Sequence, residues 1–272
     1  MKKNNSLLLS APYVVWMLLF TLIPLGVVAV YALTDPATQE FSLVNIKNLG
    51  MFLPTIGTSV WYALISSLIC LVLGYPVAYY IAHRGPVAQK ILYMLVMLPM
   101  CMSFLLRTLA WVGLLETTGI VNRILGAVGI GPVTLIGTSG AVILGMVYNY
   151  LPYMILPLYA IIVKIDRRLI EAAEDLGCNS LGVFARVILP LSMPGILSGV
   201  TMVFVPAVST FYISQKLGGT ETMLIGDVIE RQFKSAQNPN LGAALSLVLM
   251  ILVFGCTGIM NRFGGDEEGV VV

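Results

Sequence analysis

Few side chains in this sequence are of types and spacings that carry out covalent or metal chemistry. The only histidine, His83, stands beside Arg84 in a short polar stretch, where a solvated residue is commoner than a catalyst. The chain has no GxxxxGK[ST] phosphate loop and is not expected to bind ATP by that route. The cysteines form no CxxC pair or Cys/His ligand pattern, which indicates apolar filler. They are Cys70, Cys101, Cys178 and Cys256. We therefore expect no enzyme, no metal site and no cofactor bound by this chain.

The composition indicates that lipid, not water, covers most of this chain. Of its 272 residues, 58% are hydrophobic and only 10% are charged, and the mean hydropathy is +0.93. Soluble domains carry about 25% charged residues. A water-soluble enzyme is excluded on this ground, and we expect no nucleic-acid partner.

Six apolar runs are long enough to cross a bilayer, which takes about 20 helical residues. They lack the alternating pattern of an outer-membrane barrel, so helices are expected. The predicted spans are 12–33, 58–82, 91–114, 141–163, 194–214 and 242–260. This predicts an all-α polytopic membrane protein with a single transmembrane domain over 1–272. The first run exceeds the length of a signal-peptide core and is expected to be retained.

The positive charges favour an orientation with both termini in the cytosol. In that orientation the inner segments hold nine of the fifteen Lys and Arg residues. They are Lys2, Lys3, Arg84, Lys90, Lys164, Arg167, Arg168, Arg186 and Arg262. The outer segments hold five, and Arg107 lies within the third run.

The inner connection 164–193 is long, polar and helix-prone. Its sequence predicts a short helix from Arg167 to Leu176, a backbone turn at Gly177, and a second helix capped by Asn179 or Ser180. Such a helix-turn-helix is too polar for lipid, yet it has an apolar side that needs a protein partner.

Within this connection, Glu171-Ala172-Ala173 is followed by Gly177, by Phe184 and by Leu189-Pro190. This pattern resembles the EAA loop of ATP-binding-cassette import permeases. The resemblance implies that these residues dock on a separate ATPase subunit and transmit its nucleotide-driven closure to the membrane helices. In the alternative interpretation, Gly177 is only a turn between two inner helices and Glu171 is a solvated charge.

Two further stretches, Arg107-Thr-Leu-Ala-Trp111 and the segment 204–219, are similar to the PotB-type permeases of spermidine/putrescine importers. The resemblance implies a bacterial inner-membrane permease subunit that forms half of a polyamine path. Its implied partners are a second six-span permease (PotC-like), two copies of an ATPase subunit (PotA-like) that uses the ATP, and an extracytoplasmic polyamine-binding protein (PotD-like). Many relatives have an acidic residue where this chain has Gln215, so a carboxylate contact there does not carry over.

An elongated polycation calls for a path with carboxylates and aromatic faces. The candidate pathway residues are Glu116, Trp111, Tyr148, Phe211, Tyr212 and Asp227. Each has a plainer interpretation. The aromatic residues suit a membrane-interface belt. Glu116 suits a boundary carboxylate that is exposed or paired with Arg107 or Arg123, Asp227 suits a solvated helix face, and Arg107 suits snorkelling or helix packing.

Two other classes of transporter stay open at this point. One is a permease for another small cationic or organic solute. The other is an ion-coupled secondary carrier, although the sequence has neither a repeat signal nor a carboxylate at mid-bilayer depth.

Overall fold

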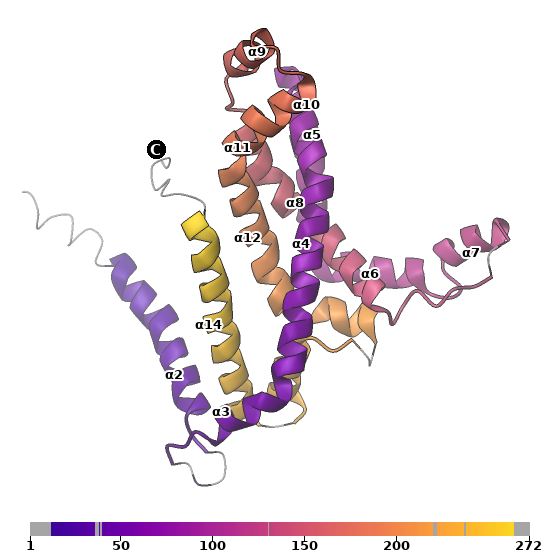
Figure 1. Cartoon of the computed structure of the whole chain (residues 1–272). Coiled ribbons are helices and arrows are strands. Elements are labelled where there is room, and N and C mark those ends of the chain that lie inside the picture. The colour runs from indigo at the N-terminus through magenta and orange to yellow at the C-terminus, as the bar shows by residue number, and fades with distance from the viewer. Residues whose placement is uncertain are drawn as a thin grey trace, which may run out of the picture. The chain divides into compact units, whose positions relative to one another are not determined.

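A computed structural model describes residues 12–35, 38, 40–129, 131–219, 222–236 and 238–263 of the chain. These residues form helices and connecting turns, and their one β-type pairing is an isolated bridge between Thr34 and Phe41. The all-α class predicted from the sequence is confirmed (Figure 1). Lys2 and Lys3, used above for orientation, lie outside the described residues.

The chain divides into two compact units. Unit 1 comprises residues 1–56 and 228–252, and unit 2 comprises residues 57–227 and 253–272. Three helices have residues in both units: α4 (Leu53–Ala82), α13 (Ile225–Lys234) and α14 (Pro239–Phe263). The remaining helices of unit 1 are η1 (Leu18–Leu22), α2 (Ile23–Ala32), α3 (Val44–Asn48) and η2 (Leu49–Phe52).

Two asparagines satisfy the backbone at the end of α2 in unit 1. Asn45 donates from Nδ2 to the carbonyls of Ala32 (3.2 Å) and Thr34 (2.9 Å). Asn240 donates from Nδ2 to Tyr31 (3.1 Å) and also to Thr34 (2.7 Å). The last carbonyls of a helix have no partner within the helix, so these amides supply the missing donors.

Unit 2 contains the segments for which the sequence predicts chemistry. Its other helices are α5 (Pro86–Met97), η3 (Leu98–Cys101), α6 (Phe104–Leu115), α7 (Ile120–Ala127), α8 (Ser139–Ile162), α9 (Arg167–Asp175), α10 (Ser180–Val183), η4 (Phe184–Ile188), α11 (Leu189–Leu191), α12 (Met193–Ser209) and η5 (Ser214–Gly218). Within this unit, α9 lies beyond the ends of α4 and α12 (Figure 1).

The core of unit 2 is the packing of α12 against α8. Both helices bury much of their length, and the buried face of α12 includes Gly195 and Gly199. A methyl group at Gly195 would lie 3.1 Å from the Pro157 carbonyl oxygen of α8. Small residues at such positions let helices in a membrane approach closely. These two helices therefore form a fixed frame for the shorter elements at both of their ends.

The predicted third span, 91–114, is wrong as a single helix. The structure divides it into Pro86–Cys101 and α6, because Met102 and Ser103 have extended backbone conformations. Pro99 lies just before the break and cannot donate a backbone hydrogen bond. Helix α6 instead joins α7 in an apolar stretch, Phe104–Ala127, that is long enough to span.

The predicted fifth span, 194–214, also ends early. Helix α12 stops at Ser209, and Thr210 is extended. At its other end, Met193–Ser209 is bent by 64° from Ser180–Leu191. Five described helices are long and apolar enough to cross a membrane, and there are six if this bent pair forms one span.

Gly226 fixes the contact between the start of α13 and the end of α12. A methyl group there would lie 2.5 Å from the Thr210 carbonyl oxygen and 2.7 Å from that of Ser209. We expect Gly226→Ala to destabilise the fold by about 1–3 kcal/mol, because backbone atoms must move to admit it. The thermal midpoint of the detergent-purified chain measures this.

Gly258→Ala is the matched control, since a methyl group at Gly258 meets nothing within 4 Å. It should leave the midpoint unchanged or raise it slightly through better helix propensity. Equal midpoints for the two variants would contradict the close approach at Gly226.

Candidate functional site

The connection 164–193 folds locally as its sequence predicts. The Asp166 side chain caps α9 by accepting from the Arg168 backbone N–H at 3.0 Å, and Asn179 caps α10 by accepting from Gly182 at 2.8 Å. Gly177 has φ +83°. Its N–H donates to the Glu174 carbonyl at 2.9 Å, while that of Cys178 donates to Ala173 at 3.0 Å. These are the two hydrogen bonds of a Schellman turn, in which the left-handed residue is usually glycine.

Helix α9 buries none of its residues against the rest of the chain. The side chains of Leu176 and Leu181, on either side of the turn, are 86% and 78% exposed. Glu171 and Ala172 are exposed as well, and Ala173 is half-buried. Large exposed apolar side chains on an otherwise polar hairpin are typical of a surface that contacts another protein.

The segment after α10 is fastened to α4 by aromatic contacts. The Phe184 ring packs edge-on against Tyr75, with centroids 5.4 Å apart, and lies 6.4 Å from Tyr79. The Tyr75 hydroxyl forms a buried 2.8 Å hydrogen bond with the Ser192 hydroxyl. Leu189 is half-buried and Pro190 is exposed. The segment that follows the hairpin therefore packs directly on α4.

The predicted pathway residues gather only in part. Trp111 of α6 packs edge-on against Tyr148 of α8, with ring centroids 5.3 Å apart. Tyr212 lies 6.2 Å from Phe104, a ring that the sequence analysis did not single out. Phe211 is 41% exposed. The structure thus forms two aromatic pairs, each joining α6 to another element of unit 2.

One face of the Tyr212 ring is already in contact with a lysine of the same chain. The Lys216 ammonium lies over the Tyr212 ring, 5.9 Å from its centroid. An exposed contact of this kind contributes about 0.5–1 kcal/mol, so another cation can displace it.

The two candidate carboxylates differ in their surroundings. Glu116 ends α6 and is exposed. In the described part of the chain the only ion pair is Lys234–Glu230, so Glu116 pairs with neither Arg107 nor Arg123. Asp227 is 5% exposed, and its carboxylate accepts from the Leu224 backbone N–H at 2.8 Å. The solvated helix face proposed as the plain interpretation of Asp227 is wrong, because this carboxylate stabilises the start of α13.

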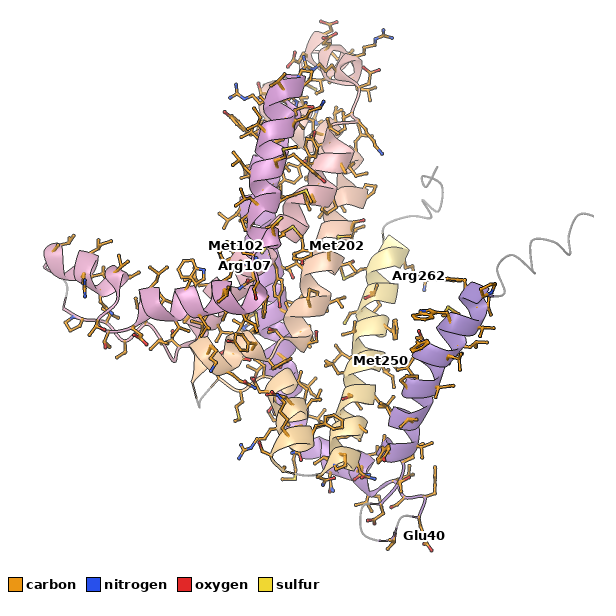
Figure 2. The ribbon with its side chains drawn as sticks, turned by 180° about the vertical axis from the view of Figure 1, so that it is seen from behind. Glu40, Met102, Arg107, Met202, Met250 and Arg262 are labelled. Carbon is orange, nitrogen blue, oxygen red and sulfur yellow. The ribbon has the colours of Figure 1, made fainter. Side chains whose placement is uncertain are left out.

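Arg107 is buried where α6 meets the bundle (Figure 2). Its side chain is 6% exposed, so it does not snorkel to a surface. Within the described residues, Nε and Nη1 have no hydrogen-bond acceptor. The guanidinium interacts electrostatically with Tyr150, whose hydroxyl donates to the Pro206 carbonyl at 3.3 Å.

A comparison with protein families decides what this architecture belongs to. Residues 71–261 match the family described as binding-protein-dependent transport system inner membrane component. The chain belongs to this family. It is therefore a multi-span component of a transport system rather than an enzyme. The family match contains the whole of the hairpin and both aromatic pairs.

Named relatives of this transport component are similar over most of their length. The chain is 40% identical over 247 residues to the spermidine/putrescine transport system permease protein PotB of Haemophilus influenzae, covering 88% of this chain and 86% of that protein. It is 38% identical over 247 residues to PotB of Escherichia coli, covering 88% and 90%.

Solved structures share the fold at low sequence identity. A bacterial ABC transporter involved in the import of alginate matches with a TM-score of 0.81 at 18% identity, covering 98% of each chain. The MetNI methionine ABC transporter matches with a TM-score of 0.58 at 18% identity, covering 80% of this chain and 96% of that one. The predicted permease fold is confirmed by these likenesses.

Three residues that hold the hairpin in place were missed by sequence reasoning. They are Tyr75, Tyr79 and Ser192. The two tyrosines are four residues apart in an apolar helix, which places them on one face. That spacing was the available signal, but nothing local identifies Phe184 as their partner.

The buried guanidinium generates a stability prediction. An ionised group that is buried without acceptors costs several kcal/mol, and an apolar residue of similar size removes that cost. We expect Arg107→Met to stabilise the purified chain by about 1–4 kcal/mol in thermal unfolding. Arg123→Met, at an exposed position on α7, should change the midpoint little. A lower midpoint for Arg107→Met would mean that the guanidinium has a stabilising partner.

Proposed function

We propose that this chain is the permease subunit of an ATP-binding-cassette importer for polyamines such as spermidine and putrescine. The observation that carries the proposal is the 38–40% identity, over 88% of the chain, to permeases named for that transport. In this proposal the chain forms half of the path through the bacterial inner membrane, with both termini in the cytosol. The other half comes from a second six-span permease, giving a heterodimer.

The hairpin formed by α9 and α10 is the proposed docking element for the ATPase subunits. Its support is the exposed leucines, the absence of buried residues in α9, and the aromatic fastening to α4. Two copies of the ATPase use the ATP, and their closure moves Phe184 and the helices behind it. Glu171, Ala172, Ala173, Gly177, Leu189 and Pro190 are the proposed coupling residues.

The proposed path runs along the aromatic pairs of α6. Trp111, Tyr148, Phe211 and Tyr212 offer π faces to ammonium groups, and Glu116 offers an exposed carboxylate. An extracytoplasmic binding protein delivers the substrate. One solved structural neighbour, an alginate transporter, is in complex with a periplasmic protein, which supports a partner of this kind.

The decisive experiment is uptake by the purified assembly in proteoliposomes. Radiolabelled spermidine and putrescine should enter only when ATP, the ATPase subunit and the binding protein are all present. Uptake of another cationic or organic solute, unaffected by excess polyamine, would overturn the substrate assignment alone. Uptake by this chain without the ATPase would overturn the whole proposal in favour of a secondary carrier.

Gly177 tests the docking assignment. Valine is strained at φ +83°, so it disrupts the turn that fixes the orientation of α9 relative to α10. We expect Gly177→Val to lower ATP-driven uptake about ten-fold, with unchanged amounts of protein in the membrane by immunoblot.

Gly129→Val is the control, because Gly129 has φ +85° but lies outside the hairpin. It imposes the same backbone strain and should leave uptake near the original rate. If the two variants lose uptake equally, general misfolding explains the result and the docking role of the hairpin fails.

Trp111 tests the aromatic path. We expect Trp111→Leu to raise the KM for spermidine uptake about five-fold, because a cation–π contact of about 1 kcal/mol is lost. Trp61→Leu is the control, since Trp61 is 61% exposed on α4 and belongs to neither aromatic pair. An unchanged KM for Trp111→Leu would remove this residue from the path.

A further inference from the structure

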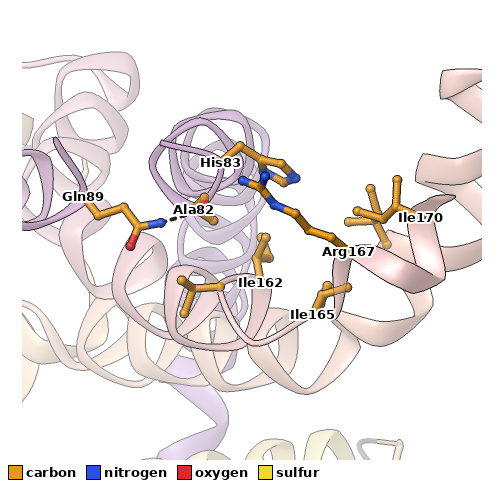
Figure 3. A pocket seen from close by; sticks show the side chains of 9 residues that line it. Ala82, His83, Gln89, Ile162, Ile165, Arg167 and Ile170 are labelled. Carbon is orange, nitrogen blue, oxygen red and sulfur yellow. Dashed lines mark hydrogen bonds between the residues drawn. The ribbon is translucent and has the colours of Figure 1, made fainter. Parts of the chain in front are cut away.

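A pocket lies where the hairpin meets the ends of two long helices. Its volume is about 180 Å³. The end of α4, the first turn of α5, the end of α8, α9 and η4 all contribute to its wall (Figure 3). Six of the nine lining residues are apolar, namely Ala82, Ile162, Val163, Ile165, Ile170 and Ile188. The other three are His83, Gln89 and Arg167, and no carboxylate lines the pocket.

The backbone around the pocket is already satisfied from within the chain. The Gln89 amide donates to the carbonyls of Ala82 and Arg84, both at 2.9 Å. At the end of α8, the N–H groups of Lys164 and Ile165 donate to Ile161 and Ile162. Helix-end carbonyls are the usual acceptors for a nearby cation. Here the carbonyls of Ala82, Arg84, Ile161 and Ile162 already accept hydrogen bonds from the Gln89 amide and from the two backbone N–H groups.

Arg167 reaches from the first turn of α9 across the pocket toward His83 (Figure 3). The nearest acid in the sequence, Asp166, is engaged as the cap of α9. Within the described residues, the guanidinium forms no ion pair and no side-chain hydrogen bond. The His83 ring is held by a 2.9 Å hydrogen bond between Nδ1 and the Tyr79 carbonyl, and its other nitrogen, Nε2, takes no part in that bond. The Arg167 guanidinium thus lies near the His83 ring, and no carboxylate lines the pocket beside them.

The charge of the segments around the pocket is mostly positive. The segments 83–90 and 164–168 carry five cations and one acid. The cations are Arg84, Lys90, Lys164, Arg167 and Arg168. A basic pocket between membrane helices attracts anionic head groups.

We infer that this pocket binds the phosphate group of an anionic phospholipid, with Arg167 as its principal ligand. The apolar wall favours a lipid over free phosphate, because a hydrated ion gains nothing from apolar surface. On α5, Val87, Ile91 and Met94 share an exposed face, but that face lies on the opposite side of the helix from the pocket-lining Gln89. The phosphate occupies the pocket, and the pocket's own apolar wall contacts the carbon atoms of the lipid.

This inference depends on the chain's place in a membrane and not on the polyamine assignment. Arg167 is the first residue of α9, so a lipid held there also holds the hairpin that carries Glu171. The charge of the surrounding lipid thereby sets how firmly the hairpin is positioned against α4 and α8.

The test is native mass spectrometry of the full-length chain, purified in detergent with its co-purifying subunits and titrated with phosphatidylglycerol. The wild type should bind phosphatidylglycerol in preference to the zwitterionic phosphatidylcholine. Arg167→Gln should weaken phosphatidylglycerol binding about ten-fold, the loss expected for one charge-assisted contact. Arg167→Lys should lie between, since it keeps the charge but loses the two-pronged geometry.

Arg168→Gln is the matched control, with the same charge change at the adjacent exposed position that does not line the pocket. It should weaken phosphatidylglycerol binding much less than Arg167→Gln, because it removes one surrounding charge and no ligand of the pocket. Equal losses in the two glutamine variants, or equal binding of the two lipids by the wild type, would overturn the site. Displacement of phosphatidylglycerol by millimolar inorganic phosphate would show a free-anion site and overturn the lipid as its occupant.

Discussion

One small cluster packs the segment that follows the exposed hairpin against α4. Phe184 packs between Tyr75 and Tyr79 of α4, and the Tyr75 hydroxyl is paired with Ser192 in a buried hydrogen bond. A buried hydroxyl without a partner costs free energy, so Tyr75 and Ser192 constrain each other's position. The turn at Gly177 fixes the shape of the hairpin, but this cluster fixes where the hairpin sits. Under the proposed function, this cluster is one route by which movement of the hairpin reaches α4.

Local signals in the sequence were sufficient for the hairpin. Gly177 and Asn179 act within four residues of themselves, through a left-handed turn and a side-chain cap. The turn at Gly177 was predicted, and Asn179 was one of the two caps predicted, the other being Ser180. The helix predicted from Arg167 to Leu176 ends at Asp175. Such features need no knowledge of distant residues, because the hydrogen bonds that define them are made to near neighbours.

The breaks in the spans could not be predicted in the same way. Hydropathy reports that 91–114 is apolar, but not whether its backbone is continuous. Pro99 lies just before the break at Met102 and Ser103, but a proline alone does not tell whether a helix kinks or ends. The end of α12 at Ser209 lies where Gly226 approaches it from a part of the chain later in the sequence. The pairing of Trp111 with Tyr148 is of the same kind, since either ring alone suits a membrane-interface belt. Asp227 was a candidate pathway residue with a solvated helix face as the plainer interpretation. Its carboxylate instead accepts from Leu224, three residues earlier, which is a local signal that the sequence analysis missed.

In the proposed path, positive charges of the chain repel a polycationic substrate, and the carboxylates of this chain alone do not offset them. Lys216 covers the Tyr212 ring, and Arg107 is buried on α6, the helix that also carries Trp111 and Phe104, so two fixed cations lie on the elements of the proposed path. Two like charges 4 Å apart repel by about 4 kcal/mol at an effective dielectric constant near 20. Gln215 is uncharged, and the Asp227 carboxylate is buried in a cap, which leaves Glu116 to favour a polycation. Under the proposed function, the remaining carboxylates must come from the second permease or the binding protein. Substrate choice is then a property of the assembly, and this chain contributes the aromatic wall and the moving hairpin.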